Sequence, residues 1–313
     1  MGKRRTPLPH GVMHLEAMRH PRRDGRSLPR DLRLDQSTLD VPEAVMPVPL
    51  GDLFADLHEF AHDELTTPID LVDCDDFPTT FFTEARRWKR IEDVVVVVAD
   101  LAYSTKLNFE KYVNTSASIY ESATGGAVRC LDPFTPEFVD IQGDGMFALF
   151  HGDRRWERAF CAAVTIKSFS ERSLVPLIEH HLSPKTPKTG FKVGMAAGIL
   201  AVKNVGVRGT NEAVWAGKPV NWAYKCAQHA DVHELIVSER VWNKIKENDY
   251  IRYSCGCGGT VTDLWRTVTV DKLPQEDWSC RLLRSAWCES CGEDFCNAIL
   301  EGDTKRLALE KVS

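Results

Sequence analysis

The chain has 313 residues, of which 43% are hydrophobic and 27% charged, and its formal net charge is −6. This composition is typical of a globular protein, and the length allows one large domain or two ordinary ones. No apolar stretch reaches the roughly 18 residues of a membrane span. The N-terminus lacks the apolar core of a secretory signal, so we expect a cytoplasmic protein with no membrane partner.

The first quarter of the chain is unevenly charged. Residues 1–33 carry nine Lys or Arg against three Asp or Glu, while residues 34–78 carry twelve acidic residues and no Lys or Arg. We predict a flexible arm over residues 1–48, either folded back on its own chain or, as such charge runs favour, solvated. Residues 49–91 are predicted as a helical extension, with an amphipathic helix from Leu50 to Leu65 and a short helix at 83–91.

The run VVVVVADL at 94–101 has the composition of a fully buried strand and ends in Asp100. A helix is predicted to begin at Ser104 or Thr105, which suit an N-cap, and to stop at Gly125-Gly126. Free backbone N–H groups at such a helix start can hold phosphate oxygens.

A hairpin is predicted at 137–150, where a Gly-Asp-Gly turn separates two apolar strands. Its tip carries Asp144. Taken alone, Asp144 is an ordinary turn aspartate and Asp100 a neighbour of a helix cap. Taken together, two carboxylates at adjacent strand ends are suited to Mg²⁺ or Mn²⁺, which prefer oxygen ligands.

The remaining elements alternate between helix and strand and predict an α/β fold with a βαββαβ core followed by αβα. They are a helix at 155–182 with a possible break at Pro176, a strand or strand pair at 191–202, a helix at 218–229, a strand at 234–238 and a helix at 239–245. Asn221 and Lys225 are four residues apart and share one helix face. Such an amide could position a sugar and such a cation could meet charge on phosphorus, although a solvated lysine on a surface helix is the simpler interpretation.

Read in order, these segments resemble the catalytic domain of class III nucleotidyl cyclases. That family has a strand ending in Phe-Ala-Asp-Ile, a Gly-Asp-Gly hairpin, a Trp-Gly-…-Val-Asn-…-Arg helix and an Ile-Leu-Val-Ser strand. The matching segments here are Val98–Leu101, Ile141–Gly145, Val214–Asn221 with Lys225, and Glu234–Ser238. The resemblance spans roughly residues 92–246, so we place a catalytic domain at 92–248 and expect helices packed on a mostly antiparallel sheet.

The resemblance also implies a site. Asp100 and Asp144 would bind two Mn²⁺ or Mg²⁺ ions, with the backbone carbonyl of Leu101 assisting. The triphosphate would lie on the turn formed by Tyr103, Ser104 and Thr105. Asn221 would orient the ribose and Lys225 would stabilise the transition state. Family members form head-to-tail dimers with active sites at the interface, and since this chain carries both halves of the site, a homodimer with two sites is implied.

Four departures from the family pattern bear on the substrate and its reaction. Cyclases that take purines place a lysine four residues before the second metal aspartate and an acidic residue before the Trp-Gly segment. This chain has Asp140 and the apolar Ala213-Val214 there, and Tyr103-Ser104 replace the Gly and Phe of the phosphate turn. Lys225 stands where arginine is usual and lacks the guanidinium fork.

The altered set resembles the pyrimidine cyclases of the bacterial antiphage system Pycsar. We therefore expect an enzyme that makes cyclic UMP or cyclic CMP, with UTP favoured over CTP, as a second messenger in antiphage defence. Two alternatives remain open: a purine cyclase with an unusual base pocket, and a non-catalytic nucleotide sensor on the same fold. A nucleic-acid-binding module is disfavoured because acidic residues such as Glu289, Glu293 and Asp294 interrupt the C-terminal segment.

Residues 249–313 form a Cys-rich segment, with six of the ten cysteines in the last 59 residues. Two closely spaced pairs, Cys255 with Cys257 and Cys288 with Cys291, suit a structural Zn²⁺ site. The first pair has one intervening residue rather than two, which weakens the match. The alternative is a set of reduced cysteines that pack as small hydrophobic side chains.

Overall fold

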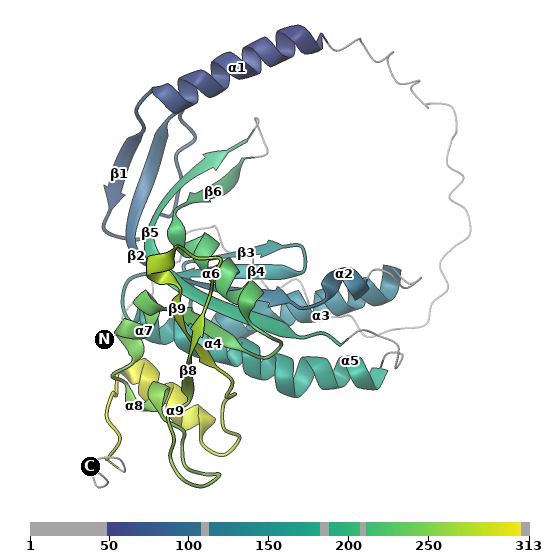
Figure 1. The fold of residues 1–313 in the computed structure, drawn as a ribbon, viewed down its shortest axis with the longest axis vertical. Coiled ribbons are helices and arrows are strands. Elements are labelled where there is room, and N and C mark those ends of the chain that lie inside the picture. Colours follow the sequence, from purple (N-terminus) through teal and green to yellow (C-terminus); the bar gives the residue numbers. More distant parts are fainter. Residues whose placement is uncertain (1–48, 108–112, 182–187, 207–210, 308–313) are drawn as a thin grey trace, which may run out of the picture. The chain divides into compact units, whose positions relative to one another are not determined.

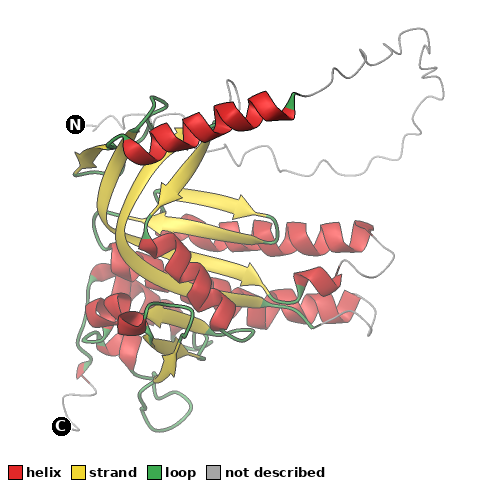
Figure 2. Cartoon of the chain, turned by 45° about the horizontal axis from the view of Figure 1, so that its top comes forward, coloured by secondary structure: helices red, strands yellow, loops and turns green. Residues whose placement is uncertain are grey.

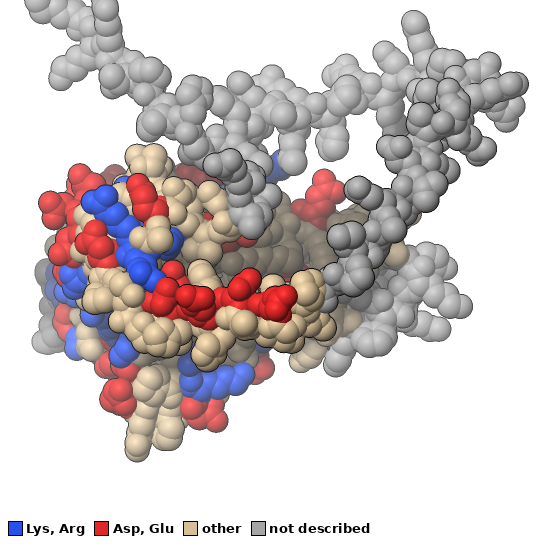
Figure 3. Space-filling view, turned by 90° about the horizontal axis from the view of Figure 1, so that it is seen from above, with Lys and Arg blue, Asp and Glu red and all other residues tan. Residues whose placement is uncertain are grey.

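The computed structural model describes residues 49–107, 113–181, 188–206 and 211–307, so the predicted arm at 1–48 lies outside the described residues. The chain divides into two units between Pro68 and Ile69. In the first unit the predicted amphipathic helix is confirmed as α1 (Leu50–Thr66), and none of its residues is buried. This helix carries five acidic residues and no Lys or Arg. Acidic side chains gather in a row on the face that Figure 3 shows.

The second unit is built on one large sheet (Figures 1 and 2). Within the described residues the sheet has nine strands: β1 (Asp70–Cys74), β2 (Arg87–Leu101), β3 (Phe138–Gln142), β4 (Gly145–Phe150), β5 (Phe191–Val205), β6 (Glu212–Ala216), β7 (Leu235–Ser238), β8 (Trp265–Thr269) and β9 (Ser279–Leu283). Their order is β3-β4-β2-β5-β7-β9-β8, with β1 also paired to β2 and β6 to β5. Among the strand pairs of the described residues, β1–β2 and β5–β7 are parallel and the others are antiparallel.

Helices cover both faces of this sheet. Their bounds are α2 (Ser104–Leu107), α3 (Val113–Leu131), α4 (Arg155–Phe169), α5 (Val175–His181), α6 (Lys218–His229), α7 (Glu239–Ile245), α8 (Asp249–Arg252) and α9 (Gly292–Glu301). A π-helical segment, Ser170–Leu174, joins α4 to α5. The predicted βαββαβ core is confirmed as β2-α3-β3-β4-α4-β5, and the fold is the expected α/β sandwich on a mostly antiparallel sheet.

The valine side chains of β2 pack in two separate hydrophobic cores, one on each face of the sheet. Because side chains alternate along a strand, Val95 and Val97 pack with α3 and α4, while Val94 and Val96 pack beneath α6. All four are 0–1% exposed. Each fully buried valine contributes roughly 1.5–3 kcal/mol to folding. The continuous apolar pattern therefore reflects a central strand that is covered on both faces, and it holds Asp100 at a rigid strand end.

Helix α6 lies unusually close to the sheet at Gly194. A Cβ atom built there would sit 2.0 Å from the carbonyl oxygen of Ala223 and 2.5 Å from the backbone nitrogen of Ala227. Only glycine allows this approach. The position of Asn221 and Lys225 on α6 is therefore set by a backbone contact with β5.

Three local predictions are wrong. The short helix at 83–91 is instead the start of β2, because Arg87–Ile91 pair with β1 and Lys89–Ile91 with β5, and strand pairing overrides local helix propensity. Helix α3 does not stop at Gly125-Gly126 but continues to Leu131, and Gly126 makes room for the ring of Phe169.

The third wrong prediction concerns the helix at 155–182, which changes at Ser170–Leu174 rather than at Pro176. Because proline removes a hydrogen bond to the preceding turn and crowds it, the irregularity lies just N-terminal to Pro176. The wider π-helical turn accommodates the missing hydrogen bond and the bulk of the proline ring.

The Cys-rich segment contributes two strands to the main sheet. Strand β9 pairs with β7, and β8 pairs with β9 at the sheet edge. No periodic pattern in this segment predicted them. The domain boundaries at 91 and 248 stay predictions.

Candidate active site

The two predicted metal carboxylates come from neighbouring strands. Asp100 is the penultimate residue of β2, and Asp144 occupies the β3–β4 turn, where Gly143 has a φ of 66°. Strand β4 pairs with β2 so that Met146 faces Ala99. A Cβ atom at Gly145 would lie 3.6 Å from Oδ1 of Asp100, so the turn rests directly against this carboxylate. The register of the sheet thus brings Asp144 beside Asp100.

The electrostatics of this pair are unbalanced. Burial raises the pKa of Asp100, and the negative charge of Asp144 raises it further, while the ammonium of Lys192 opposes the shift. The Nζ of Lys192 is 3.9 Å from Oδ2 of Asp100, too long for a hydrogen bond. Two carboxylates that repel each other at a partly buried strand end favour the binding of a cation between them.

The residues predicted to form the phosphate turn follow directly. Leu101 is buried and pairs with Phe191 of β5. Ala102 is held on both sides, donating its N–H to the Gly190 carbonyl at 3.0 Å and accepting from the Thr189 hydroxyl at 2.7 Å. The next residue, Tyr103, has a φ of 59° and is 52% exposed.

Helix α2 begins immediately after Tyr103. Ser104 is half-buried and Thr105 is exposed, at the first two positions of this helix. The Tyr120 hydroxyl donates to the Ser104 carbonyl at 3.4 Å and so links this turn to α3. The turn is consequently anchored by its flanks while Tyr103 and Thr105 face solvent.

Asn221 and Lys225 lie together, as their spacing predicts. Asn221 donates to the Gly217 carbonyl at 3.4 Å in the first turn of α6. Both side chains border an open hollow of about 550 Å³ on the outer side of this helix. The hollow is lined by Gly217, Lys218, Asn221, Trp222, Tyr224, Lys225 and Gln228. An amide and an ammonium facing one hollow can contact a bound sugar and phosphate.

Comparisons with known proteins identify the family. No protein-family model matches the chain. It is 48% identical to the uridylate cyclase of Propioniciclava tarda over 223 residues, which cover 70% of this chain and 72% of that protein. It is also 46% identical to the uridylate cyclase of Micromonospora echinofusca over 232 residues, 73% and 76% of the two chains. The chain belongs to the uridylate cyclase family.

The fold agrees with this assignment. The adenylyl cyclase CyaB from P. aeruginosa superposes with a TM-score of 0.51, at 14% identity, over 64% of this chain and 96% of that one. At this identity the likeness concerns the fold alone, and it confirms the predicted class III cyclase fold. The protein is thus a nucleotide cyclase, a lyase. In the described part of this cyclase no helix is both long and apolar enough to cross a membrane.

Two residues that sequence reasoning missed connect α6 to the carboxylates of this cyclase. The Tyr224 hydroxyl donates to Oε1 of Gln142 at 3.0 Å, two residues before Asp144. Burial and the charges of Asp140, Asp100 and Asp144 raise the pKa of Tyr224 to about 12. Lys192 donates to the Gln228 carbonyl at 3.2 Å while facing Asp100. No sequence spacing reveals Lys192, because only the pairing of β5 with β2 sets it opposite Asp100.

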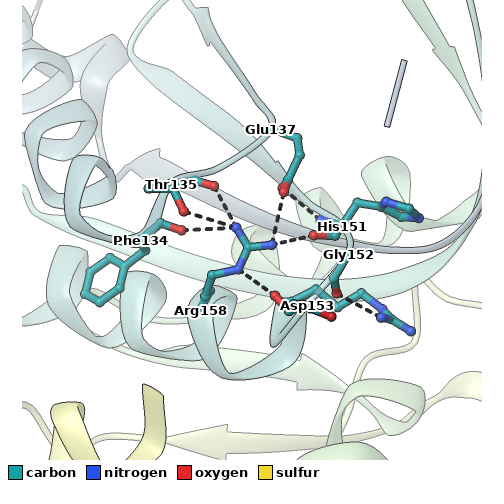
Figure 4. Close-up of polar contacts among 8 residues, drawn as sticks. Phe134, Thr135, Glu137, His151, Gly152, Asp153 and Arg158 are labelled. Atoms are coloured by element: carbon teal, nitrogen blue, oxygen red, sulfur yellow. Dashed lines mark hydrogen bonds and ion pairs between the residues drawn. The ribbon is translucent and has the colours of Figure 1, made fainter. Parts of the chain in front are cut away.

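Arg158 fixes the open end of the β3–β4 hairpin, which carries Asp144 (Figure 4). This α4 side chain is 14% exposed and pairs with Glu137 at 3.0 Å. It also donates to the carbonyl groups of Thr135, at 2.7 Å, and of His151. Because Glu137 precedes β3 and His151 follows β4, one guanidinium ties both strand ends to α4. Asp144 thereby sits on a hairpin that is anchored at its base.

The four cysteines predicted to bind zinc meet away from these residues. Their Sγ atoms all lie within 4.8 Å of one another, and we refer to them as the cysteine cluster: Cys255, Cys257, Cys288 and Cys291. The other two cysteines of the C-terminal segment are elsewhere. Cys280 contacts Cys226 beneath α6, and Cys296 contacts Cys161 on α4.

Proposed function

We propose that this cyclase converts UTP into 3′,5′-cyclic UMP and pyrophosphate with the help of two Mn²⁺ or Mg²⁺ ions. The observation that carries the proposal is the 48% and 46% identity to two proteins named uridylate cyclase. The residues at the purine-reading positions of the class III family support it. Asp140 stands where a lysine is usual and accepts from Gln142 at 3.0 Å, and Ala213-Val214 offer no acidic group to a purine edge.

The donor set fits hard divalent cations. Asp100 and Asp144 supply carboxylate oxygens, and the Leu101 carbonyl is adjacent in sequence. Burial and, to a smaller extent, the negative charge of Asp144 raise the pKa of Asp100, and a bound cation would stabilise its charged form. Bound there, such ions would lower the pKa of the ribose 3′-hydroxyl and neutralise the pyrophosphate leaving group.

The other residues bind and orient the nucleotide. The turn at Tyr103, Ser104 and Thr105 holds the triphosphate through backbone N–H groups and hydroxyls. Asn221 orients the ribose so that its 3′-oxygen faces the α-phosphorus. Lys225 places its ammonium against the phosphate oxygens, where negative charge grows as the 3′-oxygen bonds to phosphorus and the bond to pyrophosphate breaks.

The active enzyme is a head-to-tail homodimer with a site at each end of the interface. Asn221 and Lys225 border a hollow that is open to solvent, and a second subunit supplying Asp100 and Asp144 would close it. Each site then takes its carboxylates from one subunit and its amide and ammonium from the other.

The test is incubation of the purified protein with ATP, GTP, CTP and UTP, each alone, with Mn²⁺ and then Mg²⁺. Products are separated against cyclic nucleotide standards, and Asp144→Ala serves as the inactive control. We expect cyclic UMP that disappears in the control and in excess EDTA. Cyclic CMP as the main product would move the proposal to cytidylate, and cyclic AMP or cyclic GMP would overturn the base assignment. The absence of product from a folded wild-type protein would favour the alternative of a non-catalytic nucleotide sensor on the same fold.

The resemblance to Pycsar enzymes supports a role for the product as a second messenger in antiphage defence. Bacteria carrying the wild-type gene with its neighbouring genes should accumulate cyclic UMP after phage infection and form fewer plaques. The Asp144→Ala strain should do neither. Equal plaque numbers in both strains, across a phage panel, would contradict the defence role without affecting the enzymatic proposal.

A further inference from the structure

The cysteine cluster joins two loops that the chain keeps far apart. Cys255 and Cys257 lie in the loop between α8 and β8, whereas Cys288 lies between β9 and α9 and Cys291 directly precedes α9. All ten cysteines of the protein lie among the described residues and all are free thiols. The Sγ atoms of Cys257 and Cys291 are 3.5 Å apart, well beyond the roughly 2.05 Å of a disulfide bond.

The size of the cluster matches one tetrahedral metal ion. Zn–S bonds of about 2.3 Å in a tetrahedron separate the sulfur atoms by about 3.8 Å. The four Sγ atoms, all within 4.8 Å of one another, surround a space of that size. Oxygen-preferring cations do not suit four thiols, whereas Zn²⁺ does.

The backbone around the cluster favours sulfur that carries negative charge. The N–H of Cys257 points to the Cys255 sulfur at 3.5 Å, and the N–H groups of Ser290 and Cys291 point to the Cys288 sulfur. In each pair, therefore, the backbone N–H of the second cysteine donates a hydrogen bond to the sulfur of the first. Hydrogen bonds of this kind orient metal-binding thiolates.

A buried arginine adds positive charge at the same place. Arg306 is 7% exposed and donates to the carbonyl groups of Ser254, at 2.7 Å, and of Cys255, at 3.0 Å. A tetrathiolate zinc centre has a net charge of −2, which the guanidinium partly offsets. Arg306 thus holds the first cysteine loop from the C-terminal side.

The first cysteine loop is held by backbone pairing at its base, where Ser254 donates to the Thr262 carbonyl at 2.9 Å, rather than by buried side chains. From Tyr253 to Leu264 no side chain is fully buried, and the tip of the loop contains Gly256, Gly258 and Gly259. The other half is well anchored, because Trp287 donates from its backbone to Ser168 and from its indole to Thr165, both at 2.9 Å on α4. A metal ion bound by both halves can stabilise a loop that has no apolar core of its own.

We propose that the cysteine cluster binds one structural Zn²⁺ ion, which clamps the loop before β8 to the start of α9. The ion is separate from the divalent cations of the active site. It secures the C-terminal strands, since β9 leads directly into the segment that carries Cys288 and pairs with β7 of the catalytic sheet.

The first experiment measures zinc in the full-length protein, purified under reducing conditions without chelator. We expect one zinc per chain by elemental analysis, and the same content in Asp144→Ala, whose cysteines are intact. Cys288→Ser and Cys291→Ser should lose the zinc and unfold at lower temperature. Cys74→Ser, a half-buried cysteine on β1, is the matched control and should keep both properties.

The second experiment does not depend on whether the variants fold. Wild-type protein loaded with Co²⁺ in place of zinc should show the thiolate-to-cobalt charge-transfer bands of a tetrahedral sulfur site. Loss of the zinc in Asp144→Ala would overturn the proposal, because the ion would then belong to the active site. The proposal would also be overturned if the wild-type protein contained no zinc and gave no cobalt–thiolate spectrum. Fewer than ten titratable thiols in the denatured, unreduced protein would overturn it too, because some of the cysteines would then be disulfide-bonded.

Discussion

In the proposed site, Lys225 departs from the class III pattern because it stands where arginine is usual. It shares a solvent-open hollow with Asn221, so an ammonium there can reach a bound nucleotide. Lysine offers a compact charge, whereas arginine offers a planar fork of donors. The importance of the charge and of the donor geometry can therefore be tested separately, by replacing Lys225 with alanine and with arginine.

We predict that Lys225→Ala lowers kcat for UTP by about 10²-fold or more, because a charge that stabilises the transition state is lost. Lys225→Arg should keep activity within about tenfold of wild type, since the charge remains. Steady-state kinetics at saturating Mn²⁺ measures both. Thermal unfolding curves control for folding, and equal activity of Lys225→Ala and wild type would remove Lys225 from the mechanism.

If Asp100 binds metal as proposed, its function opposes the stability of the metal-free protein. Its raised pKa means that the folded protein holds the Asp100 proton more tightly than the unfolded chain does. Between the ordinary aspartate pKa near 3.9 and the raised value, the contribution of this group to the free energy of unfolding therefore falls as pH rises. At neutral pH the metal-free protein carries the full cost of this charge.

Asp100→Asn should accordingly unfold a few degrees above wild type at pH 7 in EDTA while losing cyclase activity. At pH 4 the difference should shrink, because the raised pKa of Asp100 leaves a larger fraction of this carboxyl protonated in the wild type than at pH 7. Adding Mn²⁺ should raise the unfolding temperature of the wild type and not of the variant. Scanning calorimetry at the two pH values tests this. An unfolding temperature of Asp100→Asn below that of wild type at neutral pH would contradict it.

At the scale of elements, the contact of α6 with β5 decides where Asn221 and Lys225 stand. The sequence predicted both elements, and Pro219 in the first turn marked the start of the helix. It did not predict that Gly194 permits backbone contact between them, because a glycine inside a strand pattern has several explanations.

Gly194→Ala should lower the free energy of unfolding by about 2 kcal/mol or more, because the new methyl group would overlap the Ala223 carbonyl. It should also reduce cyclase activity by displacing α6. The matched control is Gly125→Ala on α3, where a Cβ atom meets nothing within 4 Å. This control should gain about 0.5–1 kcal/mol from helix propensity. Urea unfolding compares the two, and similar stabilities of both variants would refute the close contact.

At the scale of the whole molecule, the proposed dimer predicts complementation between two inactive chains. Asp144→Ala removes one half of the site and Lys225→Ala the other. In a heterodimer of the two, one site receives both defects and the other receives none.

Equal mixing with free subunit exchange should therefore restore about a quarter of wild-type activity, since half of the dimers are mixed and each has one intact site. Co-expression with two affinity tags allows the heterodimer to be isolated and assayed directly. Each variant mixed with itself is the control. Activity that never exceeds that of the separate variants would favour a site built within one chain.

Local patterns in the chain were enough to predict the order of the core elements and, with the family resemblance, to name the candidate site residues. The valine run, the Gly-Asp-Gly turn and the Asn221–Lys225 spacing are local patterns, and each reflects the backbone geometry of a single strand, turn or helix. Local patterns failed where distant segments competed with them. The helical pattern at 83–91 yielded to strand pairing with β1 and β5, and Gly126 proved to be a packing site rather than a helix end.

The residues that surround the site, by contrast, are brought there by contacts between distant segments. Strand register set Lys192 opposite Asp100, and the packing of α6 brought Tyr224 to Gln142. Arg158 anchors the hairpin through hydrogen bonds to residues as far as 24 positions away in the sequence. The cysteine cluster likewise depends on two loops separated by a strand pair. These contacts follow from long-range pairing and packing, which single-segment periodicity does not encode.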